Sequence, residues 1–193
     1  MIKKLIENLN HKFKESFIVL FFIFFITFIV IKQSEFKSID EFKGKQIHLG
    51  GYYIGKILSS SAINFDSNKN KEFKKLDKFL KKNKLTRNGF PFTIYTSRSQ
   101  QTIQYIAAIP IKDCKKINLP IKLVCNYFPK QDVLTVIHKG YLNDRNKGWE
   151  ILEKELLIKN KELFNAPFEV YLNGIEQTKD STTWITGLYY PIK

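Results

Sequence analysis

The chain of 193 residues has few of the side chains that build metal sites and disulfide frameworks, with two cysteines and three histidines. Two cysteines are too few for a cysteine-rich zinc module. Neither the GxGxxG spacing nor the GxxxxGK[ST] spacing of common nucleotide-binding loops occurs. The sequence therefore predicts neither a cofactor nor a bound metal.

Acidic residues and arginines are also scarce. Lysine and arginine number 32 against 18 aspartates and glutamates, for a net charge of +14, yet the arginines are limited to Arg87, Arg98 and Arg145. Recognition of base edges relies heavily on arginine, and no base-stacking motif accompanies the lysines. We therefore expect no nucleic-acid partner.

The apolar content is that of a folded protein, because 44% of the residues are hydrophobic and 15% are aromatic. If the first 32 residues form a separate segment, residues 33–193 suffice for one core. They are too few for two ordinary domains. Large multidomain enzymes are thus excluded.

One long hydrophobic run lies near the start, at Phe17–Ile31, and it contains a single polar residue, a threonine. Fifteen helical residues rise about 22 Å, and extension over residues 13–32, with Lys14 and Lys32 snorkelling, approaches the roughly 30 Å of a bilayer core. A helix in the core of so small a domain would be amphipathic, and this run has no polar face. A cleaved signal peptide would need a small-x-small site, which the sequence lacks. We predict a cytoplasmic tail and a transmembrane helix over residues 1–32.

The orientation of this predicted single-pass helix is not fixed by charge. Four lysines flank each side, namely Lys3, Lys4, Lys12 and Lys14 before the run and Lys32, Lys37, Lys43 and Lys45 after it. We expect a cytoplasmic N-terminus, a linker over residues 33–45 and an extracytoplasmic globular part. Cys114 and Cys125 would then lie in an oxidising compartment, where they either pair or remain two buried thiols.

The globular part contains two similar stretches, about residues 46–112 and 133–193. Three landmarks occur in the same order in both: residues 47–52 (IHLGGY) and 137–141 (IHKGY), 91–95 (PFTIY) and 167–171 (PFEVY), 109–112 (IPIK) and 190–193 (YPIK). An ordered set of matches indicates an internal duplication.

Each copy has the same sequence of periodicities. Apolar residues at helical spacing come first, at Phe73, Leu76 and Leu80 and again at Trp149, Leu152, Leu156 and Leu157. Two strand-like runs follow, at residues 92–96 and 102–109 and again at 168–172 and 182–190. The fold class is therefore α+β, a duplicated strand-helix-hairpin unit. Two such units must join into a larger antiparallel sheet, with a groove between the halves.

At these residues the chain resembles the GyrI-like family, the small-molecule-binding domain of AraC-type and multidrug-sensing regulators. The resemblance covers about residues 46–193 and rests on the duplication, the His138-x-Gly140-Tyr141 turn, Trp149, Tyr171 and the closing Tyr190-Pro191-Ile192. It implies a curved antiparallel sheet with two helices, similar to the SOUL haem-binding fold. It also implies a cleft for amphipathic or aromatic small molecules.

Cation-binding members of that family carry a glutamate four residues before the closing proline. Here that position is Gly187, and the corresponding position of the first copy is Ile106. Glu169 is the nearest carboxylate, and strand alternation puts it on one face with Tyr171. If the neighbouring strand also faces the groove, the candidate ligand-binding residues are Tyr141, Trp149, Glu169, Tyr171, Ile185, Gly187 and Tyr189.

Two other features carry weaker functional hypotheses. His48 and His138 occupy matching landmarks, but repeat ancestry explains them as well as a metal or haem role, since no ligand partners lie at suitable spacing. The lysine-rich stretch Lys69–Lys84 could contact anionic lipid, or simply form a solvated helix face.

The sequence thus favours a membrane-anchored, non-enzymatic domain that binds an amphipathic or aromatic effector. One alternative is a GyrI-like hydrolase of electrophilic small molecules, in which Glu169 would orient water. Another is a protein-interaction domain of the gyrase-inhibitor type.

Overall fold

A computed structural model describes residues 37–99, 101–115 and 117–193. Ser38–Lys193 form one compact unit. The described elements are β1 (Ile39–His48), β2 (Gly51–Ser61), η1 (Ala62–Asn64), α2 (Phe65–Lys82), β3 (Phe92–Arg98), β4 (Thr102–Pro110), β5 (Val124–Phe128), β6 (Gln131–Lys139), η2 (Leu142–Arg145), α3 (Asn146–Ile158), β7 (Phe168–Asn173), η3 (Ser181–Thr183) and β8 (Ile185–Pro191).

The predicted membrane helix over residues 13–32 lies outside the described residues. Within the part of the chain that is described, neither helix has both the length and the hydropathy of a membrane span.

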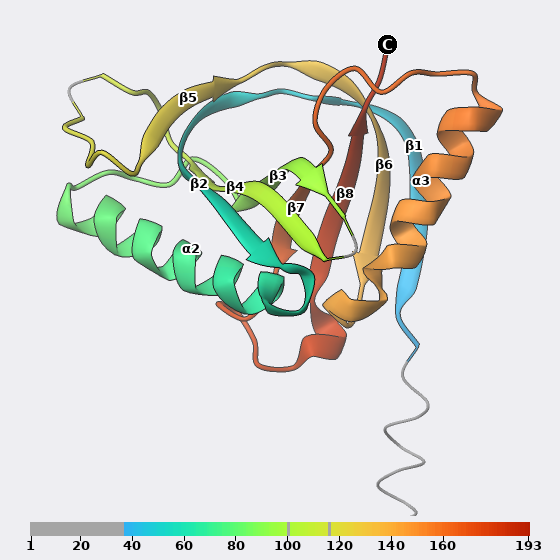
Figure 1. Cartoon of the computed structure of the whole chain (residues 1–193), viewed down its shortest axis with the longest axis horizontal. Coiled ribbons are helices and arrows are strands. Elements are labelled where there is room, and N and C mark those ends of the chain that lie inside the picture. Colours follow the sequence, from blue (N-terminus) through green and yellow to red (C-terminus); the bar gives the residue numbers. More distant parts are fainter. Residues whose placement is uncertain (1–36, 100, 116) are drawn as a thin grey trace, which may run out of the picture. The chain divides into compact units, whose positions relative to one another are not determined.

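All eight described strands form one curved antiparallel sheet in the order β1-β6-β8-β7-β3-β4-β2-β5, and two helices pack on it (Figure 1). The predicted α+β class with a curved sheet and two helices is confirmed. The predicted strand-helix-hairpin units are β2-α2-β3-β4 and β6-α3-β7-β8. They join edge to edge, where β3 pairs with β7.

The junction between β3 and β7 has nearly two-fold symmetry. Tyr95 N donates to Pro167 O over 2.9 Å, and Tyr171 N donates to Pro91 O over 3.0 Å. Each tyrosine is thus the structural counterpart of the other, as the PFTIY and PFEVY landmarks predicted. The outer registers also match, because Pro110 pairs with Tyr53 in one half as Pro191 pairs with Val133 in the other.

The first landmark pair, however, is wrong. Residues 47–52 contain the turn from β1 to β2. Residues 137–141 instead lie between the end of β6 and the start of η2, which continues into α3. The register that equates Tyr53 with Val133 places the counterpart of His138 near the end of β2, not at His48. Both segments contain glycine because each needs positive φ, at Gly50 (φ 70) and at Gly140 (φ 129). The shared requirement for glycine made unrelated turns look alike.

The stretch expected to be a linker is also partly a strand, because β1 begins at Ile39. Its sequence reads as polar because β1 is an edge strand that pairs with β6 alone. Lysines such as Lys43 and Lys45 are typical of edge strands, where they discourage pairing with other chains. Phe42 is the residue through which β1 packs on the main core.

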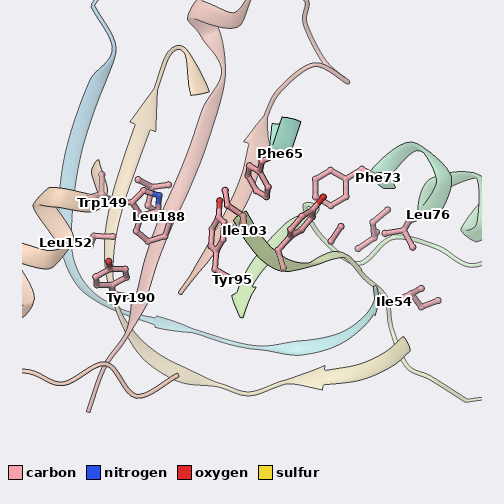
Figure 2. Close-up of a cluster of buried hydrophobic side chains, with 14 of the residues drawn as sticks. Ile54, Phe65, Phe73, Leu76, Tyr95, Ile103, Trp149, Leu152, Leu188 and Tyr190 are labelled. Carbon is pink, nitrogen blue, oxygen red and sulfur yellow. The ribbon is translucent and has the colours of Figure 1, made fainter. Parts of the chain in front are cut away.

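The two helices cover one face of the sheet and leave the other to a second, helix-free core. The main cluster includes Leu76 of α2 and Leu152 of α3, whereas the second cluster is built from strand residues such as Phe92 and Phe168. Figure 2 shows the main cluster, with Tyr95 and Ile103 between the side chains near the two helices. The sheet curves over its second face, where Phe128 of β5 packs against Phe168 of β7. This face is therefore buried by strands, without a further layer of helices.

The helical stripes are largely as predicted, with two differences. Lys69 of α2 is completely buried, so the lysine-rich stretch is not a uniform solvated face. Leu157 of α3 is 80% exposed, so the buried stripe of that helix ends before it.

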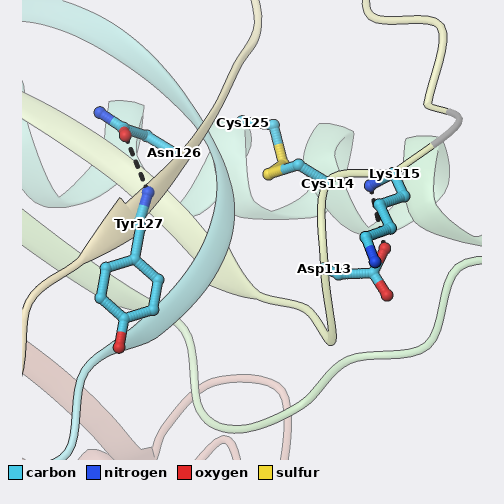
Figure 3. Close-up of a disulfide and its surroundings, with 6 residues drawn as sticks. All are labelled: Asp113, Cys114, Lys115, Cys125, Asn126 and Tyr127. Atoms are coloured by element: carbon cyan, nitrogen blue, oxygen red, sulfur yellow. Dashed lines mark hydrogen bonds between the residues drawn. A yellow bond between two sulfur atoms is a disulfide. The ribbon is translucent and has the colours of Figure 1, made fainter.

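The two cysteines form a disulfide, Cys114–Cys125, with a Cα–Cα distance of 5.9 Å (Figure 3). The structure therefore supports the paired alternative over two buried thiols. The bond ties the loop after β4 to β5, the short strand at the other edge of the sheet.

Candidate functional site

A cleft of about 1050 Å³ lies where the end of β3 faces the first turns of α3. Its walls include the aromatic rings of Tyr95, Trp149 and Tyr190, whose ring centroids lie 5.9 Å (Tyr95 to Trp149) and 5.3 Å (Trp149 to Tyr190) apart. Figure 2 shows these three side chains together. Aromatic walls with a few polar groups are typical of small-molecule sites.

Glu169 of β7 is completely buried beside this cleft. Its Oε1 accepts from Arg145 Nε at 2.9 Å and from Trp149 Nε1 at 3.3 Å. Its Oε2 accepts from the Tyr171 hydroxyl at 2.6 Å. Since each oxygen already has a strong donor, this carboxylate is poorly placed to orient water for hydrolysis.

A second carboxylate, Asp66 of α2, which is 30% exposed, completes a charge-balanced network around the buried residues. Asp66 Oδ1 lies 2.6 Å from Lys69 Nζ, and Asp66 Oδ2 lies 3.0 Å from Arg145 Nη1. The network thus contains two acids and two bases, drawn from α2, η2 and β7. Buried charges are tolerated when they are paired in this way.

The pKa directions follow from burial and these pairs. Burial alone would raise the pKa of Glu169, but Arg145 and Lys69 outweigh it and lower that pKa. Burial lowers the pKa of Lys69, against the opposing effect of Asp66. Burial, reinforced by the charge of Glu169, raises the pKa of Tyr171 well above its usual value. The network therefore keeps Glu169 ionised and Tyr171 protonated at neutral pH.

Arg98, at the end of β3, lies at the mouth of the cleft. Its guanidinium carbon is 5.0 Å from the Trp149 ring centroid and 5.3 Å from that of Tyr95. Across the described residues, no carboxylate lies within ion-pair distance of Arg98. A cation on two aromatic faces is favourable even without a carboxylate.

Of the seven predicted ligand-binding residues, Trp149 alone lines the cleft, while Glu169 and Tyr171 are linked to it by hydrogen bonds behind that wall. The three β8 candidates lie on the opposite face, because Glu169 pairs with Leu188 and Tyr171 with Thr186. Residues directly opposite in an antiparallel pair share a face. Gly187, Tyr189 and Ile185 therefore point away from Glu169, which corrects the assumption that both strands face one groove.

The opposite face is closed at these positions. The Tyr189 ring stacks on Phe168 at 4.7 Å. A Cβ added at Gly187 would lie 2.5 Å from the Tyr189 hydroxyl. The space beside Gly187 is thus filled by Tyr189.

Tyr141, the remaining candidate, belongs to the turn before η2. Its carbonyl accepts from His138 Nε2 at 2.9 Å, and its amide donates to Ser38 Oγ at 3.2 Å. In this segment of the chain, the first residue that lines the cleft is Leu142, one position after Tyr141.

His48 and His138 do not share a site. His138 is buried against Asp40, with 2.8 Å between Nδ1 and Oδ1, whereas the His48 ring packs 4.8 Å from that of Phe168 in the second core. Across residues 37–193, apart from positions 100 and 116, no cluster of metal-ligating side chains occurs.

Sequence reasoning missed Tyr95, Lys69, Arg98 and Arg145. The duplication could have identified Tyr95, because it is the counterpart of Tyr171. Arg145 is one of three arginines in the chain, but nothing in its local sequence links it to Glu169.

The comparisons with known proteins reach the fold and no further. No family model and no curated protein matches the chain. A cryo-EM structure of an EcmrR–DNA complex is similar over 88% of this chain, with 19% identity and a TM-score of 0.70. The chain spans 63% of that longer protein.

Two single-domain structures align over nearly their whole length. The EcmrR C-terminal domain matches 81% of this chain and 98% of its own, with 18% identity and a TM-score of 0.61. This chain has the same fold. SAV2435 bound to tetraphenylphosphonium matches 79% of this chain and 94% of its own, with 12% identity and a TM-score of 0.55.

Proposed function

We propose that the chain is a membrane-anchored, non-enzymatic effector-binding domain that takes an amphipathic or aromatic small molecule into the cleft beside α3. The observation that carries this proposal is the 1050 Å³ cleft with Tyr95, Trp149 and Tyr190 on its walls. The shared fold with SAV2435, solved with tetraphenylphosphonium, supports a small-molecule role.

The buried charges refine the expected ligand. Glu169 is already neutralised by Arg145 and Lys69. A lipophilic cation that entered the cleft would therefore meet the exposed carboxylates of Glu150 and Glu153 rather than a buried, unpaired one. We expect the aromatic walls to provide most of the affinity. Neutral, cationic and anionic aromatic ligands should therefore differ only modestly in affinity.

The test is calorimetric titration of the full-length chain with a panel of neutral, cationic and anionic aromatic compounds. Glu150 lines the cleft on the exposed side of α3, so Glu150→Phe should narrow it and weaken binding by about tenfold or more. Lys154→Phe, one helical turn away and outside the lining, is the matched control. No binder in the panel, or equal affinity in both variants, would refute the assignment.

The membrane anchor at residues 13–32 remains part of the proposal, with the globular part outside the cytoplasm. The Cys114–Cys125 disulfide supports this side, because such bonds persist in oxidising compartments. A topology reporter fused after Lys193 should be active on the extracytoplasmic side. A cytoplasmic signal would contradict the proposal and would reopen a gyrase-inhibitor type of role.

We further propose that α2 contacts anionic lipid. Lys69 cannot take part because it is buried, but Lys71, Lys74, Lys78 and Lys82 are exposed at helical spacing. An environment-sensitive dye on Lys78→Cys should shift to the blue in nanodiscs of anionic lipid and not in zwitterionic ones. Equal spectra in the two lipids would count against this contact.

A further inference from the structure

A second, smaller groove lies beneath α2, on the same face of the sheet as the cleft. Its volume is about 40 Å³, and it lies among residues of α2, β7 and β8. Its lining includes Asn70, Phe73, Tyr171, Asn173 and Trp184.

This groove is the symmetry counterpart of the cleft. The registers that equate the halves relate Tyr171 to Tyr95 and Pro91 to Pro167, and each pair contributes one residue to each site. The apolar stripes of the helices match Phe73 with Trp149, so Asn70 of α2 corresponds to Asn146 of α3, and both line their respective sites. The duplication has therefore produced two equivalent sites, of which one is open and one nearly filled.

The difference in volume comes from one connection. β3 and β4 are joined by residues 99–101, whereas β7 and β8 are joined by residues 174–184. In the longer connection, Ile175, Glu176 and Gln177 line the groove directly. This connection, residues 174–184, is the flap of the groove.

An ion pair fastens the flap to the rest of the fold. Glu176 accepts two hydrogen bonds from Arg87, at 2.9 and 3.3 Å, and Arg87 also donates to Asp77 of α2 at 2.9 Å. Both partners are about one-third exposed, at 29% for Arg87 and 33% for Glu176. A partly exposed pair of this kind is weak enough for the flap to open.

One lining residue of the groove, Asn173, has a buried acceptor without a partner among the described residues. Asn173 Nδ2 donates to Thr183 O at 3.1 Å, but the buried Asn173 Oδ1 has no hydrogen-bond partner among the described residues. The rings of Phe73 and Tyr171 lie 5.5 Å apart beside it, and Trp184 lines the same space. A buried polar atom without a partner is rare and calls for a donor.

We propose that the groove beneath α2 is a second ligand site, for a small aromatic molecule with one O–H or N–H donor, such as a phenol. The ring would contact Phe73 and Trp184, and its donor would bind Asn173 Oδ1. A space of 40 Å³ holds solvent rather than a ring, so the flap must move aside on binding. This site does not depend on occupancy of the cleft.

The two tryptophans of the chain allow a site-specific test, because Trp149 lines the cleft and Trp184 lines the groove. The full-length chain in lipid nanodiscs is labelled with 5-fluorotryptophan, and Trp149→Phe and Trp184→Phe assign the two ¹⁹F resonances. Phenol should shift the Trp184 resonance saturably, and toluene, its counterpart without the hydroxyl, should bind about fivefold more weakly or worse.

Three variants provide controls. Asn70→Phe fills the groove and should abolish the Trp184 shift, whereas Glu150→Phe narrows the cleft and should leave the Trp184 shift intact. Glu176→Gln loosens the flap and should lower the apparent Kd for phenol about two- to fivefold. A Trp184 resonance that phenol leaves unchanged, a shift that survives Asn70→Phe, or equal affinity for phenol and toluene would each overturn the proposal. Failure of the cleft appears separately, on the Trp149 resonance.

Discussion

Arg145 donates from Nε to Glu169 Oε1 over 2.9 Å, and the two residues are 9% and 0% exposed. Arg145 precedes α3, while Glu169 lies in the middle strand pair, so the contact ties the start of a helix to the centre of the sheet. An ion pair withdrawn this far from water depends on both partners, because either charge alone would be left without solvation.

A double-mutant cycle on this pair should therefore be strongly non-additive. Glu169→Gln and Arg145→Met should each lower the free energy of unfolding by about 3–5 kcal/mol. The double variant should lose clearly less than the sum, because neither charge then remains buried alone. Urea unfolding followed by far-UV circular dichroism measures all four proteins. Additive losses would show that the pair is not coupled.

Stability should fall in acid with a contribution from the same carboxylate. Despite burial, Arg145 and Lys69 lower the pKa of Glu169 below its ordinary 4.5 in the folded state. A carboxyl with a depressed folded pKa binds more protons when unfolded, so its stabilisation is present above about pH 4.5 and is lost as pH falls through the folded value. The urea midpoint of the wild type should drop between about pH 5 and pH 2, and the profile of Glu169→Gln should be flatter over that range. Parallel profiles would contradict this assignment.

Removal of the disulfide should lower stability through the unfolded state. Cys114 and Cys125 are 11 residues apart in sequence, and closing a loop of that size contributes about 3 kcal/mol. Cys114→Ser with Cys125→Ser should lose about that amount in urea unfolding. Adding a reductant to the wild type should reproduce the loss and leave the double variant unchanged. A larger effect of reductant on the double variant would point to another cause.

Two glycines separate backbone strain from lack of space. Gly44 and Gly50 have φ of 73 and 70, but a Cβ at Gly44 meets nothing within 4 Å, whereas one at Gly50 would lie 2.2 Å from Phe128 O. Gly44→Ala should cost about 1–2 kcal/mol, the price of a left-handed conformation. Gly50→Ala should cost at least about 3 kcal/mol, because the two turns it holds together must separate. Equal melting temperatures would refute the close approach of these turns.

How far the sequence could predict the site is clearest on β7 and β8. The alternation within each strand was sufficient to place Glu169 and Tyr171 on one face. It could not relate β7 to β8, because a shift of one residue in register exchanges the faces of a whole strand. The observed pairing of Glu169 with Leu188 sends Gly187 and Tyr189 to the other core.

The glutamate itself was found for a reason that the structure changes. Glu169 is predicted as a ligand contact because it is the nearest carboxylate to Gly187 and shares a strand face with Tyr171. Its partners, Lys69 and Arg145, are 100 and 24 residues away along the chain, so no local pattern could show that its charge is already balanced. Long-range pairs of this kind become visible only when the chain is folded.

The sequence by itself determined the helix and the hairpin of each repeated unit, because helical and strand periodicities are local and because each unit is repeated with its prolines and tyrosines in place. It did not show β1, whose polar edge-strand residues are typical of a linker. The tertiary structure decided which faces meet, which charges pair and which of two equivalent grooves stays open. These outcomes depend on strand register and on one long connection, residues 174–184. Hydrogen bonds within the connection, such as Trp184 Nε1 to Thr178 O, and the distant ion pair of Glu176 with Arg87 together hold its path.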